Sequence, residues 1–418
     1  MAQWSISRLR LFVLHWCLSL RCRGVAGWAP ARYSARSRLR STQVTSEVDD
    51  DLAWVFSRSH EETAEDECEV PGDSSTRCVA TSQHRVVWRR RPRSVLVLAK
   101  RHADSAEIDA ACELCAKLAA EKCDVLLAQP LFDRLVDRLK ARQINATEWH
   151  QDTAQGDPDF VSTLGGDGLL LYANTLFQRG RPPPVMAFSS GSLGFLAPFD
   201  SDATTVGETV RSLMSRSRWP VSLRLRLRCR IVSADGVEIA RHEALNEAVV
   251  DRGSSPFLSA VACFCNNEHL TTVQADGLIV ATPTGSTAYS LAAGGPMLHP
   301  SAPAIVFTPI CPHSLAFRPI VFADSAKLRL DVDPHARADA WVTFDGRRRV
   351  RLRRGAKLYV EASPFPLPTV LRRGNTADWF EGLHSSFNFN TRARQKPFPP
   401  DTATDFPPNT TAEGPAFL

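Results

Sequence analysis

A carboxylate surrounded by glycines is the first group in the sequence that could do chemistry. Asp167 lies between Gly166 and Gly168, with Gly165 before it, where one apolar run ends and another begins. Glycines let the backbone turn tightly and approach a ligand closely, and a helix that starts here would offer free N–H groups to a phosphate. A carboxylate at that point could orient or deprotonate a hydroxyl group. The alternative is that Asp167 is an ordinary helix N-cap, and the stretch alone does not decide between the two.

A second loop of the same kind follows a predicted strand at residues 185–188. Residues 189–196 read Ser-Ser-Gly-Ser-Leu-Gly-Phe-Leu, so glycine, including Gly191, and hydroxyl groups come directly after the strand. Open α/β sheets bind ligands at the carboxyl ends of their strands. Two such loops predict a shared ligand site, although an ordinary connecting turn remains the alternative for this loop taken alone.

A third stretch joins an apolar strand to a cluster of hydroxyl side chains. Residues 277–281 are apolar, and residues 282–290 read Thr-Pro-Thr-Gly-Ser-Thr-Ala-Tyr-Ser. A helix needs only one cap, so capping explains one of these hydroxyl groups and not the cluster. Hydroxyl and backbone N–H groups at a helix start can hold a ribose, an amide or a phosphate.

Other motifs are weaker or absent. Asn246-Glu247 lies in a β-like run and could reach a ligand or close a turn, and Asp345-Gly346 predicts a hairpin turn. The sequence contains neither a G-x-x-x-x-G-K-[ST] phosphate loop nor an H-E-x-x-H zinc motif. Among the eleven cysteines, Cys112 and Cys115 have the most suggestive spacing. A lone pair in a predicted helix favours reduced cysteines over a metal or redox site.

Composition and charge are ordinary for a globular protein. The 418 residues are 44% hydrophobic and 23% charged, and they provide enough chain for two domains. The formal charge of +5 is too small to indicate a nucleic-acid-binding protein. The longest apolar runs are too short to span a bilayer.

The hydrophobic pattern predicts the scaffold that must position these loops. Strands at 94–99, 123–128, 160–164 and 185–188 alternate with helices at 107–122, 131–142 and 169–177, which predicts an α/β domain with a parallel sheet at 87–200. A helix at 203–216 follows, and residues 201–372 are otherwise mainly β-like. Within them, the Leu-Arg alternation of residues 223–228 predicts one half-buried strand at 221–230 with its arginines on a solvated face.

The two ends of the chain differ from this core. Residues 1–46 contain no Asp or Glu and many Arg and Ser residues, as organelle transit peptides do. We therefore favour a mitochondrion or plastid, and a secretory signal or a basic tail on a cytoplasmic protein remains the alternative. Residues 47–86 are acidic and polar and are predicted to be a disordered linker. Residues 378–389 are amphipathic, and 397–418 are predicted to be a disordered tail.

These motifs together resemble those of the NAD kinases, most closely the eukaryotic type. The resemblance spans roughly residues 88–396 and is carried by 164–168, 191–196, 246–247, 271–289, 299–319, 341–347 and 378–381. The run 271–289 is the most specific of these. Gly-Gly-Asp-Gly alone is shared with phosphofructokinases and with diacylglycerol and sphingosine kinases.

The resemblance implies a fold, a reaction and an assembly. The fold would be an N-terminal α/β domain and a mainly β, NAD-binding domain, with the active site in the cleft between them and residues 373–396 packed back on the first domain. The reaction would transfer a phosphoryl group from ATP, with a divalent ion such as Mg²⁺, to the adenosine-ribose 2′-hydroxyl of NAD, giving NADP. The partners would be small-molecule nucleotides, not nucleic acid or membrane, and the protein would be a homo-oligomer, a dimer or a tetramer.

The resemblance also assigns roles to residues. Asp167 matches the catalytic carboxylate that engages the 2′-hydroxyl. The phosphate side is matched by Gly165, Gly166, Gly168 and Gly191. Asp167 and Gly168 also match the NAD side of the site. The other residues that match it are Asn246, Glu247, Asp276, Thr284, Thr287, Ala288, Tyr289 and Ser290. Arg347 is a weaker candidate. No residue is assigned directly to the metal.

One departure from the family pattern follows Gly168. The family usually has threonine there, and this chain has Leu169, which removes a hydroxyl group that could serve ATP or its metal. Two other functions stay open on the sequence: a catalytically inactive NAD(P)-binding sensor, and a related kinase of a sugar or a lipid. The choices between NAD and NADH and between ATP and polyphosphate also stay open.

Overall fold

The computed structural model describes residues 53–58, 84–151, 156–191 and 194–387. The predicted targeting segment 1–46, the tail 397–418 and most of the predicted linker 47–86 lie outside these residues, as do 388–396. The linker prediction is wrong where the structure describes it. Strand β1 (Trp54–Arg58) pairs with β2 (His84–Trp88), because Trp54 and Val86 bury their side chains in the first domain's core. In the described part of the chain, no helix has the length and apolarity needed to cross a membrane.

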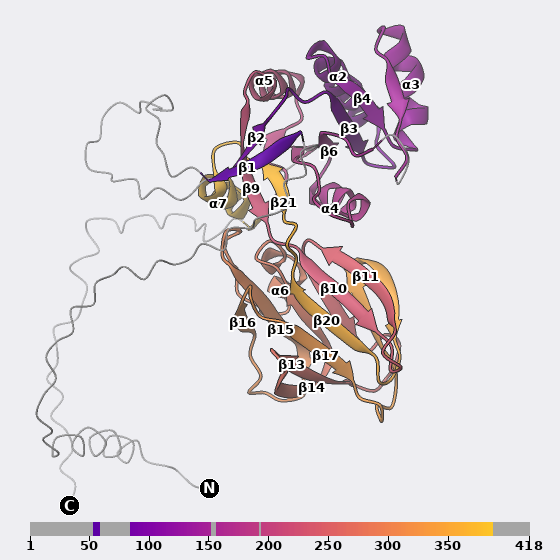
Figure 1. The fold of residues 1–418 in the computed structure, drawn as a ribbon, viewed down its shortest axis with the longest axis vertical. Helices are drawn as coiled ribbons and strands as arrows, with labels where there is room; N and C mark the ends of the chain where they lie inside the picture. The colour runs from indigo at the N-terminus through magenta and orange to yellow at the C-terminus, as the bar shows by residue number, and fades with distance from the viewer. Residues whose placement is uncertain (1–52, 59–83, 152–155, 192–193, 388–418) are drawn as a thin grey trace, which may run out of the picture. The chain divides into compact units, whose positions relative to one another are not determined.

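The first domain is built on a ten-stranded sheet (Figure 1). Its order is β1-β2-β9-β21-β7-β6-β3-β4-β5, and β8 pairs with β7. The remaining strands are β3 (Ser94–Ala99), β4 (Asp124–Leu127), β5 (Ala146–Glu148), β6 (Phe160–Leu164), β7 (Val185–Ser189), β8 (Phe199–Asp200), β9 (Arg218–Arg224) and β21 (Leu367–Val370). All pairings among β3 to β8 are parallel, which confirms the predicted parallel sheet.

Helices cover both faces of this sheet. Alternate residues of a strand point to opposite faces; Val95 and Val97 of β3 pack in one apolar cluster, and Leu96 and Leu98 pack in another. The first cluster includes side chains of α2 (Ser105–Ala120), α3 (Leu131–Ala141) and α5 (Ala203–Met214). The second includes those of α4 (Asp167–Leu176). The helix α4 that carries Asp167 therefore packs on the face opposite to α2, α3 and α5.

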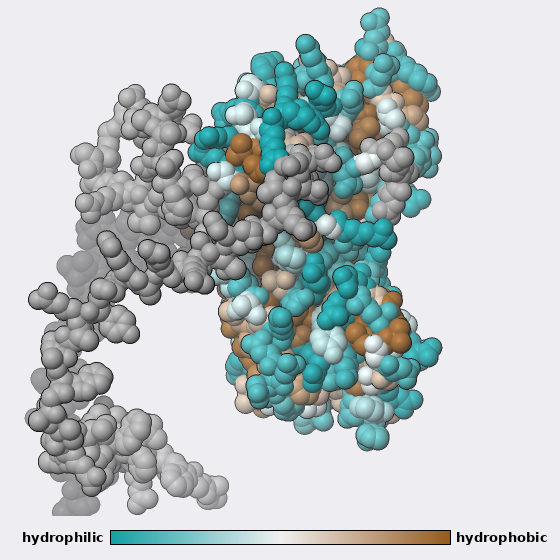
Figure 2. All heavy atoms as spheres, in the orientation of Figure 1, coloured by the Kyte–Doolittle hydropathy of each residue, from teal (hydrophilic) through white to brown (hydrophobic). Residues whose placement is uncertain are grey.

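The second domain is an eleven-stranded antiparallel sheet, which confirms the prediction of a mainly β region. Its order is β11-β10-β20-β17-β13-β14-β12-β18-β19, and β15 pairs with β14 and β16. The strands are β10 (Leu227–Val232), β11 (Glu238–Ala244), β12 (Glu247–Asp251), β13 (Ser259–Cys265), β14 (Glu268–Ala281), β15 (Ala304–Pro312), β16 (Ile320–Ala323), β17 (Leu328–Val332), β18 (Ala340–Phe344), β19 (Arg347–Leu352) and β20 (Lys357–Ala362). A short turn of 3-10 helix (Gly285–Thr287), α6 (Tyr289–Ala292) and α7 (Asn375–Phe387) complete the described elements. On the face shown in Figure 2, the described surface is mainly hydrophilic, with small apolar patches.

The Leu-Arg alternation is not one strand. The chain leaves the first sheet at Arg224, where β9 ends, and enters the second sheet at Leu227, where β10 begins. β9 and β21 lie beyond the residue 200 boundary drawn from the sequence, and both pair within the first sheet. The two sheets are therefore joined by chain crossings next to the predicted site.

Candidate active site

Asp167 connects the first two glycine loops. It is the first residue of α4, and Gly166 occupies the N-cap position. The Asp167 carboxylate accepts hydrogen bonds from the backbone N–H groups of Phe195 (3.1 Å) and Leu196 (3.0 Å), which follow β7. The N-cap alternative for Asp167 is therefore wrong, and the carboxylate is held by the neighbouring loop.

Gly194 allows this close approach. A Cβ atom at Gly194 would lie 2.1 Å from Asp167 Oδ1 and 2.8 Å from its Cγ, so no other side chain fits while the carboxylate stays in place. The sequence pointed to this loop but assigned no role to Gly194. A glycine is needed at this position because the backbone has to lie directly against the carboxylate.

Burial raises the pKa of the Asp167 carboxyl above its usual value. Hydrogen bonds from the N–H groups of Leu196 and Phe195 oppose this rise, and so does the positive charge of Arg224. A carboxylate with a raised pKa is a stronger base than an exposed one. The position suits a group that accepts a proton.

Arg224 links the first two loops to the third, and its predicted solvated position is wrong. It is only 7% exposed, although it lies at the end of β9, where the chain passes from the first sheet to the second. Its guanidinium donates to the Thr369 hydroxyl (2.9 Å), the Thr284 hydroxyl (3.4 Å) and the Phe195 carbonyl (3.3 Å). Burial lowers its pKa to about 10, which still leaves it charged at neutral pH.

The third loop is packed against Asn246. Gly285 lies so close that a Cβ atom there would be 2.1 Å from the Asn246 carbonyl oxygen. The Thr282 hydroxyl donates to the Leu245 carbonyl (2.6 Å) and accepts from the Gly285 N–H (3.0 Å). The structure thus brings together the hydroxyl loop and the Asn246-Glu247 pair.

Asn246 and Glu247 each keep a buried oxygen atom free. Asn246 Oδ1 and Glu247 Oε2 have no hydrogen-bond partner within the described residues. Burial, and secondarily the charge of Asp345, raises the pKa of Glu247 to about 8. A buried polar atom without a partner costs stability, and a ligand group that pairs with it removes that cost. Both side chains are therefore poised for a polar ligand.

The raised pKa of Glu247 predicts a pH-dependent stability. Between the ordinary value of 4.5 and about 8, the unfolded chain releases the Glu247 proton while the folded protein holds it. This group's contribution to stability is therefore present below the unfolded-state pKa and is lost as pH rises through about 8. Glu247→Gln should make the ligand-free protein more stable than wild type at pH 9 and no more stable at pH 4. Urea unfolding at several pH values measures this, and an identical pH dependence of the two proteins would contradict it.

The predicted phosphate-side glycines differ in their surroundings. Gly165 is buried, and its N–H donates to the Phe188 carbonyl (2.9 Å), while a Cβ atom at Gly166 or Gly168 would meet open space. Gly191 has φ +126°, a conformation that favours glycine. The turn is therefore closed on its Gly165 side and open on the other.

Leu169 and Arg347 complete this turn. Leu169 is 9% exposed and packs in the apolar cluster under α4, so the position that usually carries the family's threonine faces the core here. Arg347 Nη2 donates to the Gly168 carbonyl (3.0 Å). Arg347 therefore contacts the first turn of the helix that carries Asp167.

Only some of the residues that are predicted to bind NAD in the hydroxyl loop are exposed. The Thr284 side chain is buried and accepts from Arg224, and the Thr287 hydroxyl donates to the Thr284 carbonyl (3.2 Å). Ala288 is half-buried, and Tyr289 is 46% exposed at the start of α6. Tyr289 is thus the accessible large side chain of this loop.

Ser290 and Asp276 are engaged by other residues. The Ser290 and Thr308 hydroxyls are 2.9 Å apart in the protein interior. The Asp276 carboxylate forms an ion pair with Arg252 (2.7 Å). Both remain predicted ligand residues, and each would have to share these contacts with a ligand.

Lys100, which belongs to none of the sequence motifs, lies at the same edge of the sheet. Lys100 follows β3 directly, and its ammonium group pairs with the Glu107 carboxylate (2.6 Å), which also accepts from the Ser190 hydroxyl (2.9 Å). Lys100 also lies against Gly165, where its Cγ would be 3.4 Å from an added Cβ. Its place immediately after a buried strand was the signal that could have found it.

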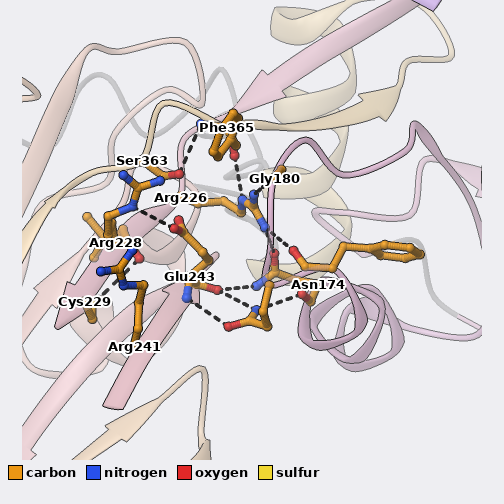
Figure 3. Close-up of polar contacts among 12 residues, drawn as sticks. Asn174, Gly180, Arg226, Arg228, Cys229, Arg241, Glu243, Ser363 and Phe365 are labelled. Atoms are coloured by element: carbon orange, nitrogen blue, oxygen red, sulfur yellow. Dashed lines mark hydrogen bonds and ion pairs between the residues drawn. The ribbon is translucent and has the colours of Figure 1, made fainter. Parts of the chain in front are cut away.

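The far end of α4 is fixed to the second sheet. Arg226 is fully buried and donates to the carbonyl groups of Phe177 (2.8 Å) and Gly180 (3.3 Å), just past the helix end (Figure 3). A positive charge at a helix C-terminus is favourable. The Asn174 amide of α4 donates to the Glu243 carbonyl (2.8 Å) of β11. The predicted solvated face is therefore wrong for Arg226 too, and these contacts hold α4 in place.

The C-terminal helix α7 covers the loop that holds Asp167. Phe387 packs on Phe195 with 5.3 Å between the ring centroids, and a Cβ atom at Gly382 would be 3.0 Å from the Phe195 ring. Trp379 lies edge-on to His299 at 5.2 Å. The segment around Trp379 therefore packs next to the candidate site.

Two family models match the chain, and both describe domains of ATP-NAD kinases. The sequence model of the ATP-NAD kinase N-terminal domain matches residues 95–217, and that of the ATP-NAD kinase C-terminal domain matches residues 245–371. Together they span more than half of the chain and include all three loops.

Two individual relatives of the chain are named as NAD kinases. The chain is 42% identical over 322 residues to NAD kinase 2, chloroplastic, of Arabidopsis thaliana, which covers 76% of this chain and 32% of that protein. It is 40% identical over 281 residues to an NAD(+) kinase of Saccharomyces cerevisiae, which covers 63% and 52%. The chain thus spans about a third to a half of the length of these relatives.

A solved structure shares the fold. The crystal structure of yeast NADH kinase complexed with NADH matches with a TM-score of 0.68 and 29% identity, covering 75% of this chain and 93% of that one. The match extends over both sheets, in agreement with the two-domain architecture described above.

Proposed function

The chain belongs to the ATP-NAD kinase family, and on that premise we propose that it phosphorylates the 2′-hydroxyl of the adenosine ribose of NAD with ATP, giving NADP and ADP. The observation that carries the proposal is the setting of Asp167. Its half-buried carboxylate lies at the start of α4 beside an open glycine turn, and Arg224 connects its loop to the hydroxyl loop of the second sheet.

The donor is proposed to bind at the glycine turn. The first N–H groups of α4 and the positive end of its dipole favour phosphate there. Lys100, whose side chain is 47% exposed, adds a positive charge at the same edge. Among the described residues no group of three or more His, Cys, Asp or Glu side chains is placed to hold a metal. Because Mg²⁺ is commonly bound by substrate phosphates with few protein ligands, we propose that the phosphates hold it and that it neutralises their charge.

The acceptor is proposed to lie between Asp167 and the second sheet. The ribose oxygen attacks the γ-phosphorus, the bond from that phosphorus to the bridging oxygen breaks, and its electron pair leaves with ADP. The hydroxyl proton passes to the Asp167 carboxylate. Because phosphoryl transfer has a loose transition state with little early demand for deprotonation, Asp167 orients the hydroxyl first and accepts the proton late. Asn246 and Glu247 offer their free oxygen atoms to the nucleotide.

An assay of NADP formation by the purified full chain tests the proposal. We expect ADP and NADP in equal amounts from ATP and NAD, and no turnover with sphingosine or fructose 6-phosphate as acceptor. Binding of NAD without ADP release would identify an inactive sensor, and turnover with sphingosine or the sugar would identify the related kinase. Parallel reactions with NADH and with polyphosphate decide the preferred acceptor and donor.

Assembly and location extend the proposal. We propose a homo-oligomer, a dimer or a tetramer, on the family resemblance. An organelle location is proposed from residues 1–46, and the Arabidopsis relative named chloroplastic supports it.

A further inference from the structure

Asp345 is a buried carboxylate in a place where a turn alone would not need one. It lies between β18 and β19 with φ +50°, followed by Gly346 with φ +65°, which confirms the predicted hairpin turn. Asp-Gly satisfies such a turn through its backbone, and its side chain commonly faces solvent. Here the Asp345 side chain is buried.

The carboxylate collects four N–H donors. Its Oδ1 accepts from the backbone N–H groups of Asn246 (2.7 Å) and Glu247 (3.2 Å). Its Oδ2 accepts from the backbone N–H of Leu245 (2.9 Å) and from the Asn174 amide of α4 (3.4 Å). Hydrogen bonds to an ionised acceptor in the interior are among the stronger ones. One side chain therefore holds three consecutive residues of the second domain and one residue of the helix that carries Asp167.

Two of the three residues, Asn246 and Glu247, present the free oxygen atoms. The Leu245 side chain is buried in the apolar cluster on which α4 packs. This packing anchors residues 245–247 to the first domain. With all three N–H groups bound to Asp345, the backbone at Asn246 and Glu247 has one orientation before any ligand arrives. The neighbouring Arg347 contact to the Gly168 carbonyl (3.0 Å) ties the same turn to the start of α4.

We propose that Asp345 is the positioning residue of the acceptor site: it pre-orders Asn246 and Glu247 and fixes them relative to the helix that carries Asp167. The proposal rests on the proposed function for the identity of the acceptor, NAD. Preordering a site lowers the free-energy cost of binding, so its loss should appear first in acceptor affinity.

Asp345→Asn tests the proposal in the full chain. Asparagine keeps the shape but has one acceptor oxygen and an NH₂ group, so some of the four donors would face another donor. We expect the dissociation constant and the KM for NAD to rise at least about tenfold, which corresponds to a loss of about 1.4 kcal/mol of binding free energy. The KM for ATP should stay within about twofold of the wild-type value. Equal changes in both KM values, or an unchanged KM for NAD, would overturn it. Absence of NADP formation by wild type would instead refute the proposed function.

A matched control exists in the same hairpin. Asp339 also accepts a backbone N–H, from Arg354 (3.1 Å), and pairs with Arg351 (2.7 Å), but it lies before β18 at the opposite end of the hairpin. Asp339→Asn should leave the KM for NAD unchanged. A rise equal to that of Asp345→Asn would show a general loss of hairpin structure and would overturn the proposal.

Hydrogen exchange of the wild-type protein keeps the proposal testable if Asp345→Asn fails to fold. The amides of Leu245, Asn246 and Glu247 should already exchange slowly without nucleotide. If they exchange as fast as exposed turn amides and become slow only when NAD is added, the ligand orders the segment and Asp345 does not.

Discussion

Asp167→Asn should leave the fold intact and reduce kcat at least about a hundredfold, because general-base contributions are typically worth about 10²–10⁴-fold. The Asp167 carboxylate is half-buried, and its partial burial raises its pKa, so the folded protein gains little stability from its charge. An asparagine carbonyl can still accept from the Phe195 or the Leu196 N–H. What is lost is the group that receives the proton of the ribose hydroxyl.

The measurement is steady-state NADP formation beside thermal unfolding. Asp109→Asn is the matched control, because Asp109 is an exposed carboxylate on α2 paired with Arg138, and its removal should leave kcat unchanged. Near wild-type turnover by Asp167→Asn would remove Asp167 from its proposed role. A large loss of thermal stability in that variant would show that its part is structural.

Gly194→Ala should reduce kcat about as strongly without removing any ionisable group. The backbone φ of Gly194 is not positive, so alanine meets no backbone strain there. Its Cβ would lie 2.1 Å from Asp167 Oδ1, and the carboxylate or its loop has to move. Displacement of a reacting group by about 1 Å can cost about a hundredfold in rate.

The control for this variant is Gly207→Ala. Gly207 lies inside α5, and a Cβ atom there would meet only the flexible end of Lys117 at 3.3 Å. Alanine in a helix interior is favoured over glycine by about 0.5–1 kcal/mol, so the control should gain stability and keep its activity. If Gly194→Ala turned over NAD at the wild-type rate, the close approach of this loop to Asp167 would have no catalytic role.

These two predictions depend on the same arrangement of loops. Asp167 is held by N–H groups of the loop after β7, and α7 covers that loop through Phe195. Arg224 then joins it to Thr284. A change at any of these contacts should act on the reaction through the position of Asp167.

Local patterns in the sequence determined the elements and the three loops. The strands at 94–99 and 160–164 have the predicted bounds, and the strand at 185–188 extends by one residue. Apolar periodicity and glycine or hydroxyl clusters are short-range signals that a single segment carries by itself. The parallel sheet followed from strand–helix alternation, and it placed two of the loops at one edge before any contact was known.

The tertiary structure alone decided which side chains meet. Period-two alternation shows which residues of a strand share a face, but it does not show what covers that face. The Leu-Arg run passes from one sheet to the other, so Arg224 and Arg226 became buried bridges although the pattern predicted solvent. Asp345 likewise appeared as a turn residue, and its partners are some hundred residues earlier in the chain. Such contacts depend on how two sheets are placed against each other, and no local spacing encodes that placement.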